Sequence, residues 1–291
     1  MHTTDSRYMN ALLDFTGSDT NFSLHYRAAS TPGLLLPPFH ANWSTFNLAE
    51  PAMRILLVSE CVNATSAGGG PFDGCFIDRA NYGREMLAVY RQTGHTPPLL
   101  TPTDVEGLSA GGDALLAEVQ AAVGPALVVA KMHGDLAGWG PASTNAYMFN
   151  DGLCSRYDKV NRAAGGWLDG PGCLDQMQAV LAATARGATV QCRAMGPTTG
   201  PDGQGNLTFT LAAFLAVAGN MSYFSYASNG HDSYELGFTM WPSEFDRPLG
   251  PPTGPAVRSG PNGSVFHRKF ASGTAVVVDA LRGTANIDWA R

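Results

Sequence analysis

Asp78 is the residue of this sequence best placed to do chemistry. It follows Cys75–Ile77, a short apolar stretch that predicts a β-strand, and polar residues such as Asn81 come after it. In a parallel α/β barrel the carboxyl ends of the strands form the active-site rim, so we expect Asp78 to point into a site. An ionised carboxylate there can act as a nucleophile or a general base. The alternative is that Asp78 only caps the turn that follows.

A second carboxylate is needed if a proton must be given to a leaving group. Asp169 follows the predicted strand Gly166–Leu168, and it lies two strands from Asp78 if the strand Ala126–Met132 stands between them. We therefore predict Asp169 as the general acid. The alternatives for this role are Glu235 and Asp151.

Aromatic and hydrogen-bonding side chains on the predicted rim loops form the candidate substrate-binding set. Aromatic rings offer a flat apolar area on which a ligand can stack, although packing in the core is the ordinary role of any one of them. His133 and Asp135 favour hydrogen bonding over metal binding, because no third ligand stands at a matching spacing. The predicted binding residues are His40, Trp43, Asn81, His133, Trp167, Tyr223 and Glu235, with Trp139 and Trp241 as further aromatic candidates.

The sequence predicts no metal and no cofactor, and it excludes several partners. No serine nucleophile on a strand-to-helix elbow is expected, and Gly68–Gly70 lacks the context of a phosphate-binding loop. A formal net charge of −6 without a Lys/Arg cluster argues against nucleic acid. No apolar run reaches the roughly 18 residues that span a bilayer, so no membrane span is predicted. The pattern leaves the oligomeric state open.

The elements that must position these residues repeat a short apolar strand, a polar turn and an amphipathic helix, which is typical of a parallel α/β sheet or barrel. The predicted strands are Tyr8–Leu13, Leu34–Leu36, Cys75–Ile77, Ala126–Met132, Gly166–Leu168, Ala188–Cys192 and Tyr223–Tyr226. The predicted helices are Pro51–Val62, Asp113–Val123, Cys173–Arg186 and Leu207–Ala218. Asn47 and Glu50 have the spacing of a capping box before the first helix.

We predict an α/β fold of the (β/α)8 TIM-barrel type over residues 1–245, incomplete because an eighth strand is missing. Residues 246–263 are a Pro/Gly-rich linker, and residues 264–291 form a small C-terminal β hairpin element around Ala271–Gly273. The chain begins without the basic and apolar regions of a secretory signal. We therefore expect an N-terminal part to be absent from this sequence.

Glycosylation sequons and cysteines indicate in which cellular compartment the protein folds. Six Asn-x-Ser/Thr sequons occur, where about two are expected by chance, which favours a glycosylated protein of the secretory pathway over accidental matches. They are Asn21, Asn42, Asn63, Asn206, Asn220 and Asn262. The five cysteines have no metal-ligand spacing and are open to one or two disulfides or to buried thiols. Cys154 with Cys173 is the preferred pair, and the odd count leaves at least one cysteine unpaired.

Four segments carry a resemblance to a known family. The segment Phe72–Asn81 reads FDGCFIDRAN, and Gly165–Asp169 reads GGWLD. Leu211–Leu215 precedes an aromatic strand, and Leu249-Gly-Pro-Pro pairs with Arg268-x-Phe-x-x-Gly273 near the end. Together, over roughly residues 70–280, they resemble TIM-barrel glycoside hydrolases of a glycosyl hydrolase-like family, distantly like the α-galactosidase superfamily.

The resemblance implies cleavage of O-glycosidic bonds by two carboxylates. It implies Asp78 as the nucleophile or base, whereas an Asp at position 169 departs from the Glu often found there and has a shorter reach. The predicted function is therefore a glycosidase acting on an extracellular glycan or polysaccharide. The alternatives are a carbohydrate-binding barrel without turnover and, third, a metal-dependent hydrolase using His133 and Asp135.

Overall fold

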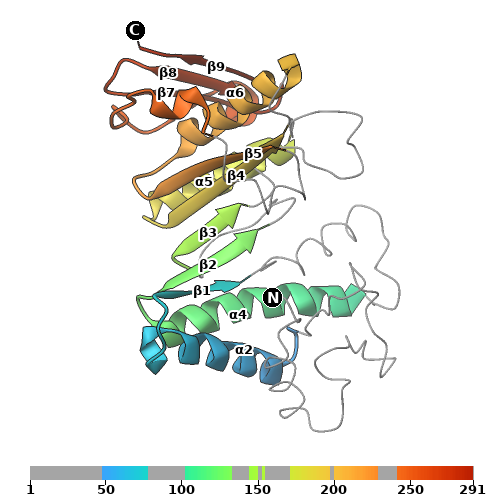
Figure 1. Ribbon diagram of the computed structural model, residues 1–291. Coiled ribbons are helices and arrows are strands. Elements are labelled where there is room, and N and C mark those ends of the chain that lie inside the picture. Colours follow the sequence, from blue (N-terminus) through green and yellow to red (C-terminus); the bar gives the residue numbers. More distant parts are fainter. Residues whose placement is uncertain are drawn as a thin grey trace. The chain divides into compact units, whose positions relative to one another are not determined.

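The computed structural model describes residues 48–77, 102–132, 144–149, 153–154, 171–196, 200–228 and 241–290 of the 291-residue chain. These residues belong to two compact units (Figure 1). The first unit contains the described residues up to Met132 together with Thr144 and Asn145, and the second contains those from Ala146 onward. The predicted strands Tyr8–Leu13, Leu34–Leu36 and Gly166–Leu168 lie outside the described residues.

The first unit is built around a β-α-β arrangement. It contains helix α2 (Pro51–Ala64), the 3-10 helix η1 (Ser66–Gly68), strand β1 (Gly74–Ile77), helix α4 (Pro102–Val123) and strand β2 (Leu127–Met132). Strands β1 and β2 are parallel, with Gly74 opposite Leu127 and Ile77 opposite Ala130. A parallel pair needs a crossover connection, and α4 lies in the chain between the two strands. The predicted strands at Cys75–Ile77 and Ala126–Met132 are thus confirmed.

Helix α2 begins later than the predicted capping box requires. Its N-cap is Glu50, whose side chain makes no capping hydrogen bond, and Pro51 occupies the first helical position. Proline suits that position because the N–H it lacks would have no partner there anyway. A helix capped at Asn47 would instead place Pro51 where its N–H is needed for the first intrahelical bond, so the capping-box prediction is wrong.

Helix α4 begins at Pro102, eleven positions before the predicted start at Asp113. Glycines in this stretch conceal the helical pattern in the sequence. A Cβ added at Gly111 would lie 2.1 Å from the carbonyl oxygen of Leu48, so the glycine lets the chain before α2 pass against the helix. Glycine has low helix propensity, but it occurs inside α4 because only a residue without a Cβ allows this close contact.

Both helices of the first unit cover one face of its strands. The buried cluster joins residues of α2, α4 and β2, with Cys75 and Ile77 of β1 packed against it. Its members are Met53, Leu57, Cys61, Leu115, Val119, Val123 and Val128. The Arg54 Nε also donates to both carboxylate oxygens of Glu118, at 3.1 and 3.2 Å, which links α2 to α4.

The second unit repeats the strand-helix pattern. It contains β3 (Ala146–Phe149), α5 (Pro171–Ala185), β4 (Thr189–Gly196), α6 (Gly200–Val217) and β5 (Ser222–Ser228), in the strand order β3-β4-β5 with parallel pairing throughout. The predicted strands Ala188–Cys192 and Tyr223–Tyr226 are confirmed, and both extend further. Strand β3 was not predicted, because its four residues, AYMF, are too few to show the alternation typical of a strand.

The helices of the second unit cover a single face of its strands. Strands β3, β4 and β5 are added in one direction, and right-handed crossovers then place α5 and α6 on the same side. Phe214 of α6 packs on Phe224 of β5, with ring centroids 5.1 Å apart. The protein is thus a mixed α/β chain whose described residues include five parallel strands, two in the first unit and three in the second. The complete eight-stranded barrel stays a prediction.

A four-stranded antiparallel sheet follows in the second unit. Its strands are β6 (Val257–Ser259), β7 (Val265–Lys269), β8 (Ala275–Asp279) and β9 (Thr284–Asp288), in that order. The predicted hairpin is confirmed as β7 and β8, and β6 and β9 enlarge it. The stretch 246–263, predicted as a linker, holds β6 and the 3-10 helix η4 (Pro261–Gly263), and the 3-10 helix η3 (Ser243–Asp246) lies at its start. The predicted domain boundaries stay predictions.

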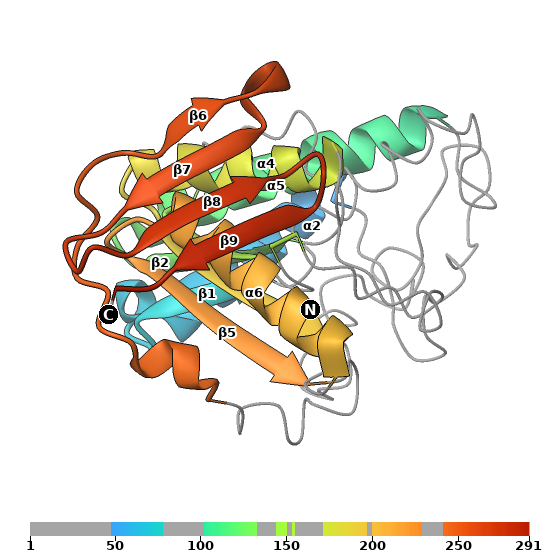
Figure 2. The ribbon, with the colours of Figure 1, turned by 90° about the horizontal axis from the view of Figure 1, so that it is seen from above.

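This C-terminal sheet packs beside α6 (Figure 2). Arg268 of β7 joins the two, because its Nη1 donates to the carbonyl oxygens of Leu215 at 3.2 Å and Ala216 at 3.4 Å, and also to that of Ala218. These are carbonyls at the end of the helix, which otherwise lack partners. The described helices include none that is both long enough and apolar enough to cross a membrane.

Candidate active site at the carboxyl ends of the parallel strands

Several predicted site residues stand in the sequence directly next to described strands or helices. Asp78 is the next residue after the end of β1, and His133 is the next residue after the end of β2. Asp169 stands two positions before Pro171, where α5 begins. Predicted residues that lie outside the described ranges are Asp78, Asp169, Asp151, Glu235, His40, Trp43, Asn81, His133, Asp135, Trp139 and Trp167.

The strands of the first unit carry different side chains on their two faces. Cys75, Ile77 and Val128 face the helices. Because side chains alternate along a strand, Phe76, Leu127 and Lys131 belong to the opposite face. Phe76 is 50% exposed and Leu127 is 40% exposed, whereas Lys131 is only 8% exposed. This face is therefore open near the start of β2 and buries a cation near its end.

Lys131 lies beside the point where β1 ends. Ile77, the last residue of β1, is opposite Ala130, so Lys131 is one step further along the same register. A charged side chain is rarely buried unless it is paired. The sequence signal that could have found this residue is a lysine near the end of an otherwise apolar strand, LVVAKM.

Arg193 takes the corresponding position in the second unit. Phe149, the last residue of β3, is opposite Cys192 of β4, so Arg193 is one step beyond the end of β3. Arg193 is 6% exposed, and its register partner on β5 is Ser225. Sequence reasoning missed this buried cation as well, although an arginine within the strand sequence TVQCRAMG was visible.

Tyr223 is the predicted binding residue that the structure describes. It is the second residue of β5, lies opposite Gln191 of β4, and is 54% exposed. This is the amino-terminal half of the strand, at the other end from the predicted rim. Tyr223 therefore stays a prediction as a substrate contact.

Trp241, a further aromatic candidate, is 70% exposed and lies ahead of η3. Its indole Nε1 donates to the Asp246 Oδ1 at 2.7 Å, and its ring meets Phe245 edge-on at a centroid distance of 5.3 Å. These two contacts fix the orientation of an exposed ring, which is the state in which an aromatic side chain can stack on a ligand.

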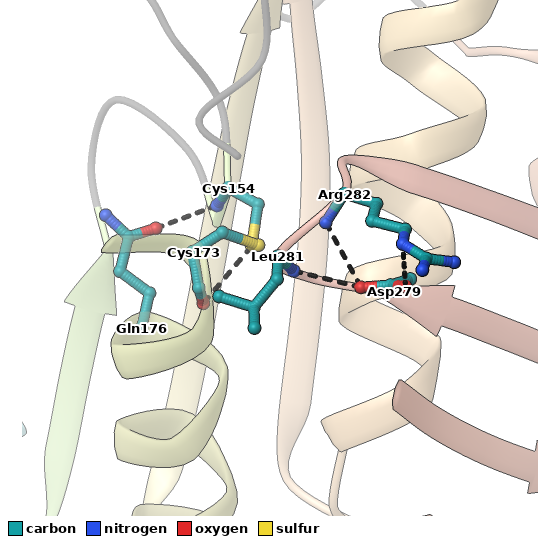
Figure 3. The surroundings of a disulfide bond; sticks show 6 residues. All are labelled: Cys154, Cys173, Gln176, Asp279, Leu281 and Arg282. Atoms are coloured by element: carbon teal, nitrogen blue, oxygen red, sulfur yellow. Dashed lines mark hydrogen bonds and ion pairs between the residues drawn. A yellow bond between two sulfur atoms is a disulfide. The ribbon is translucent and has the colours of Figure 1, made fainter. Parts of the chain in front are cut away.

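The preferred cysteine pair is confirmed. Cys154 and Cys173 form a disulfide that joins a residue shortly after β3 to the first turn of α5 (Figure 3). The backbone N–H of Cys154 donates to the Gln176 Oε1 at 2.7 Å, and both sulfur-bearing residues are fully buried. The crosslink spans 19 sequence positions, and Asp169 falls within that segment.

A second disulfide was not specified from the sequence. Cys61, in the last turn of α2, is bonded to Cys75 at the start of β1, 14 positions later. Cys192 of β4 remains a free and buried thiol, and burial raises its pKa well above the usual range for cysteine. A buried protonated thiol of this kind is a poor nucleophile.

Two other kinds of chemistry find no support in the described ranges. Gly107–Gly111 reads GLSAG, which has the residue pattern of a serine elbow, but Ser109 is buried inside α4 and not on a strand-to-helix turn. Within the described parts of the chain, no three His, Cys, Asp or Glu side chains cluster to hold a metal ion.

Comparisons with known proteins show the family. The model of hypothetical glycosyl hydrolase family 15 matches residues 35–274, and the chain belongs to this family. The predicted kinship with a glycosyl hydrolase-like family is thus confirmed, while the more distant likeness to the α-galactosidase superfamily stays a prediction. None of the curated proteins matches the chain significantly.

Two solved structures are similar to the chain. One is the glycoside hydrolase domain of PelA from Pseudomonas aeruginosa, with 16% identity and a TM-score of 0.42, over 78% of this chain and 75% of that one. The other is a single-residue variant of the same PelA domain, with 17% identity and a TM-score of 0.39, over 70% of both chains.

Proposed function

We propose that this protein is a glycoside hydrolase that cleaves O-glycosidic bonds of a glycan or polysaccharide with a pair of carboxylates. The observation that carries the proposal is the family match, which spans residues 35–274 and so includes both Asp78 and Asp169. Helices on a single face of the parallel strands in each unit support a barrel, because doubly wound sheets have helices on both faces.

Asp78 is the ionised carboxylate of this proposal. The strand that precedes it is a parallel strand with one face against helices, as barrel strands are, and Asp78 comes directly after its last residue. Catalytic residues of barrels stand at this end of the strands. The carboxylate attacks the anomeric carbon in a retaining mechanism, or activates a water in an inverting one.

Asp169 is the proposed acid that protonates the leaving-group oxygen. It belongs to the connection between β3 and α5, and such strand-to-helix connections form the catalytic rim of a barrel. The disulfide between Cys154 and Cys173 closes this connection, which limits the conformations open to it. Glu235 and Asp151 are the substitutes to be compared.

The proposed substrate contacts come from hydrogen-bonding and aromatic side chains, which orient a sugar and stack on its faces. They are His40, Trp43, Asn81, His133, Trp167, Tyr223 and Glu235.

The proposed location is outside the cytosol. Two disulfides in the described part of the chain favour an oxidising compartment. The three sequon asparagines whose burial is described are all exposed, as a glycan requires. These are Asn63, Asn220 and Asn262.

The test is release of reducing sugar from a panel of aryl glycosides and polysaccharides. We expect the wild type to hydrolyse at least one of them, and Asp78→Asn to lose about 10⁴-fold or more of kcat with little loss of binding, because the nucleophile or base acts on the transition state. Asp169→Asn, Glu235→Gln and Asp151→Asn then identify the acid. A chelator should leave the activity unchanged.

The matched control is Asp73→Asn. Asp73 is an exposed carboxylate just before β1, at the other end of the strand from Asp78, so its loss should leave hydrolysis unchanged. Retention of sugars without hydrolysis of any substrate by the wild type would overturn the enzyme proposal in favour of a carbohydrate-binding barrel.

A further inference from the structure

Trp241 is the most exposed large hydrophobic side chain among the described residues. A single apolar side chain on a surface is ordinary by itself. The ring of Trp241, however, is held in place, because its indole Nε1 donates to the Asp246 Oδ1 and Phe245 meets the ring edge-on. The indole has one polar group, and that group already has a partner, so the ring presents only flat apolar area to solvent.

This indole is supported by a series of rings that reaches the core of the second unit. Phe245 meets Phe224 of β5 edge-on, with ring centroids 5.7 Å apart, and Phe224 packs in turn on Phe214 of α6 at 5.1 Å. Phe214 is buried. An exposed ring that is already fixed loses little conformational freedom when a ligand stacks on it, so more of the contact energy remains for binding.

The support of Trp241 lies away from the proposed catalytic rim. Phe224 is the third of the seven residues of β5, in the amino-terminal half of that strand. The carboxylates proposed for catalysis belong to the segments that follow the carboxyl ends of the strands. A ligand that contacts Trp241 is therefore expected to bind at a second place on the protein.

The charges beside the ring indicate which ligand would suit it. The short helix η3 carries two carboxylates, Glu244 and Asp246. The nearest cation in the sequence, Arg247, has its guanidinium over the ring of Trp289, 5.2 Å from the centroid. The Asp246 Oδ2 can accept a hydrogen bond from a hydroxyl group, whereas an anionic ligand would be repelled by the carboxylates. A neutral ligand with an apolar face and hydroxyl groups fits this arrangement.

We propose that Trp241 and Asp246 form an accessory binding site for a neutral polysaccharide. The indole stacks on the apolar face of one sugar ring, and the Asp246 carboxylate accepts a hydrogen bond from a hydroxyl of that sugar. The choice of a sugar polymer as the ligand rests on the proposed function, which the family match supports. A second contact with the same polymer raises the effective concentration of its glycosidic bonds at the active site.

The first test is native electrophoresis in gels that contain hydroxyethyl cellulose, galactomannan, dextran or pullulan. At least one polymer should retard the wild type, and Trp241→Ala should weaken that apparent affinity about tenfold. The matched control is Phe72→Ala, which removes an equally exposed aromatic ring from the first unit and should not change retention. Wild type that none of the four polymers retards, or equal retention of Trp241→Ala, would overturn the inference.

Asp246 is tested by two variants. Asp246→Ala frees the indole and removes the acceptor for the sugar hydroxyl, so retention should weaken several-fold. Asp246→Asn keeps an oxygen acceptor for both hydrogen bonds and should retain most of the affinity. Because these side chains are exposed, the melting temperatures of all variants should stay close to that of the wild type. Equal retention of Asp246→Ala and wild type would refute the role of the carboxylate.

The second test is kinetic. Trp241→Ala should raise KM for the polymer that retards the wild type, whereas kcat/KM for an aryl glycoside should not change, because one sugar unit in the active site does not reach Trp241. Loss of activity on the aryl glycoside as well would show that Trp241 belongs to the active site and would contradict an accessory site.

The outcomes separate this inference from the proposed function. A protein that hydrolyses a substrate but is retained equally with and without the Trp241 ring would overturn the accessory site and leave the function standing. Retention that requires Trp241 in a protein that hydrolyses no substrate would support the site and refute the proposed enzyme.

Discussion

Arg268 acts as a structural residue between β7 and the end of α6. Its guanidinium donates to three carbonyl oxygens at the end of α6, where the helix dipole favours a positive charge. Burial lowers the pKa of this guanidinium from its ordinary value, and its Nε has no hydrogen-bond partner in the described structure. The residue therefore attaches the C-terminal sheet to α6.

Replacing Arg268 by Met should destabilise the protein. The variant loses charged hydrogen bonds and leaves helix-end carbonyls unpaired, for which we expect a loss of about 2 kcal/mol in the free energy of unfolding. Chemical denaturation measured by circular dichroism gives this value. The control is Arg282→Met, because Arg282 makes an exposed ion pair with Asp279 and should change stability by less than about 0.5 kcal/mol. Equal effects of the two substitutions would contradict the role of Arg268.

Single residues differ in how far the sequence alone predicts them. The Cys154–Cys173 pair was predictable, as was the strand end before Asp78, because both depend on local spacing. The burial of Lys131 and Arg193 was not, because it depends on which strands lie beside them. The Cys61–Cys75 bond likewise depends on how the end of α2 packs against β1.

At the scale of elements, the sequence placed most helices and strands but not their starting points. The pattern of apolar residues predicts a helix along its buried face. It does not predict a helix where a residue is needed for another reason, such as a close backbone contact or the start of the helix. Gly111 is there to admit the chain at Leu48, and Pro51 sets the start of α2. Strand β3 is too short for its alternation to be distinguished from that of a loop.

Gly111→Ala tests the close approach on α4. The added Cβ would lie 2.1 Å from the Leu48 carbonyl oxygen, a backbone atom that cannot turn aside, so we expect a loss of roughly 1–3 kcal/mol in stability. Gly107→Ala is the matched control on the same helix, since its nearest contact is the Ala49 Cβ at 3.3 Å. Alanine also favours the helix by about 1 kcal/mol, so the control should be neutral or stabilising in thermal melts. A stabilised Gly111→Ala would refute the contact.

At the scale of the whole molecule, the sequence predicted an α/β chain with a small β element at its end, and the described helices, parallel strands and C-terminal antiparallel sheet confirm this. The extent of the C-terminal sheet was not predictable. Pro and Gly dominate the stretch before β7, and β6 is only three residues long with exposed side chains. Its pairing with β7 depends on a neighbouring strand and not on its own residues.

The five cysteines of the chain provide a test of its covalent state. An alkylating agent should add no label to the native protein, because four cysteines are bonded and the Cys192 thiol is buried and protonated. Denaturation without reductant should give one label, and denaturation with reductant should give five, as counted by intact mass. Three labels after denaturation alone would show that one disulfide is absent.

The crosslink between Cys154 and Cys173 also has a consequence for proteolysis. A single peptide-bond cleavage anywhere between these two residues breaks the chain, but both pieces stay joined through the sulfur atoms. The segment that contains Asp169 can therefore be nicked without release of either piece. Such a nicked protein gains only the mass of the water consumed in the cleavage, stays in one piece until it is reduced, and then separates into two fragments.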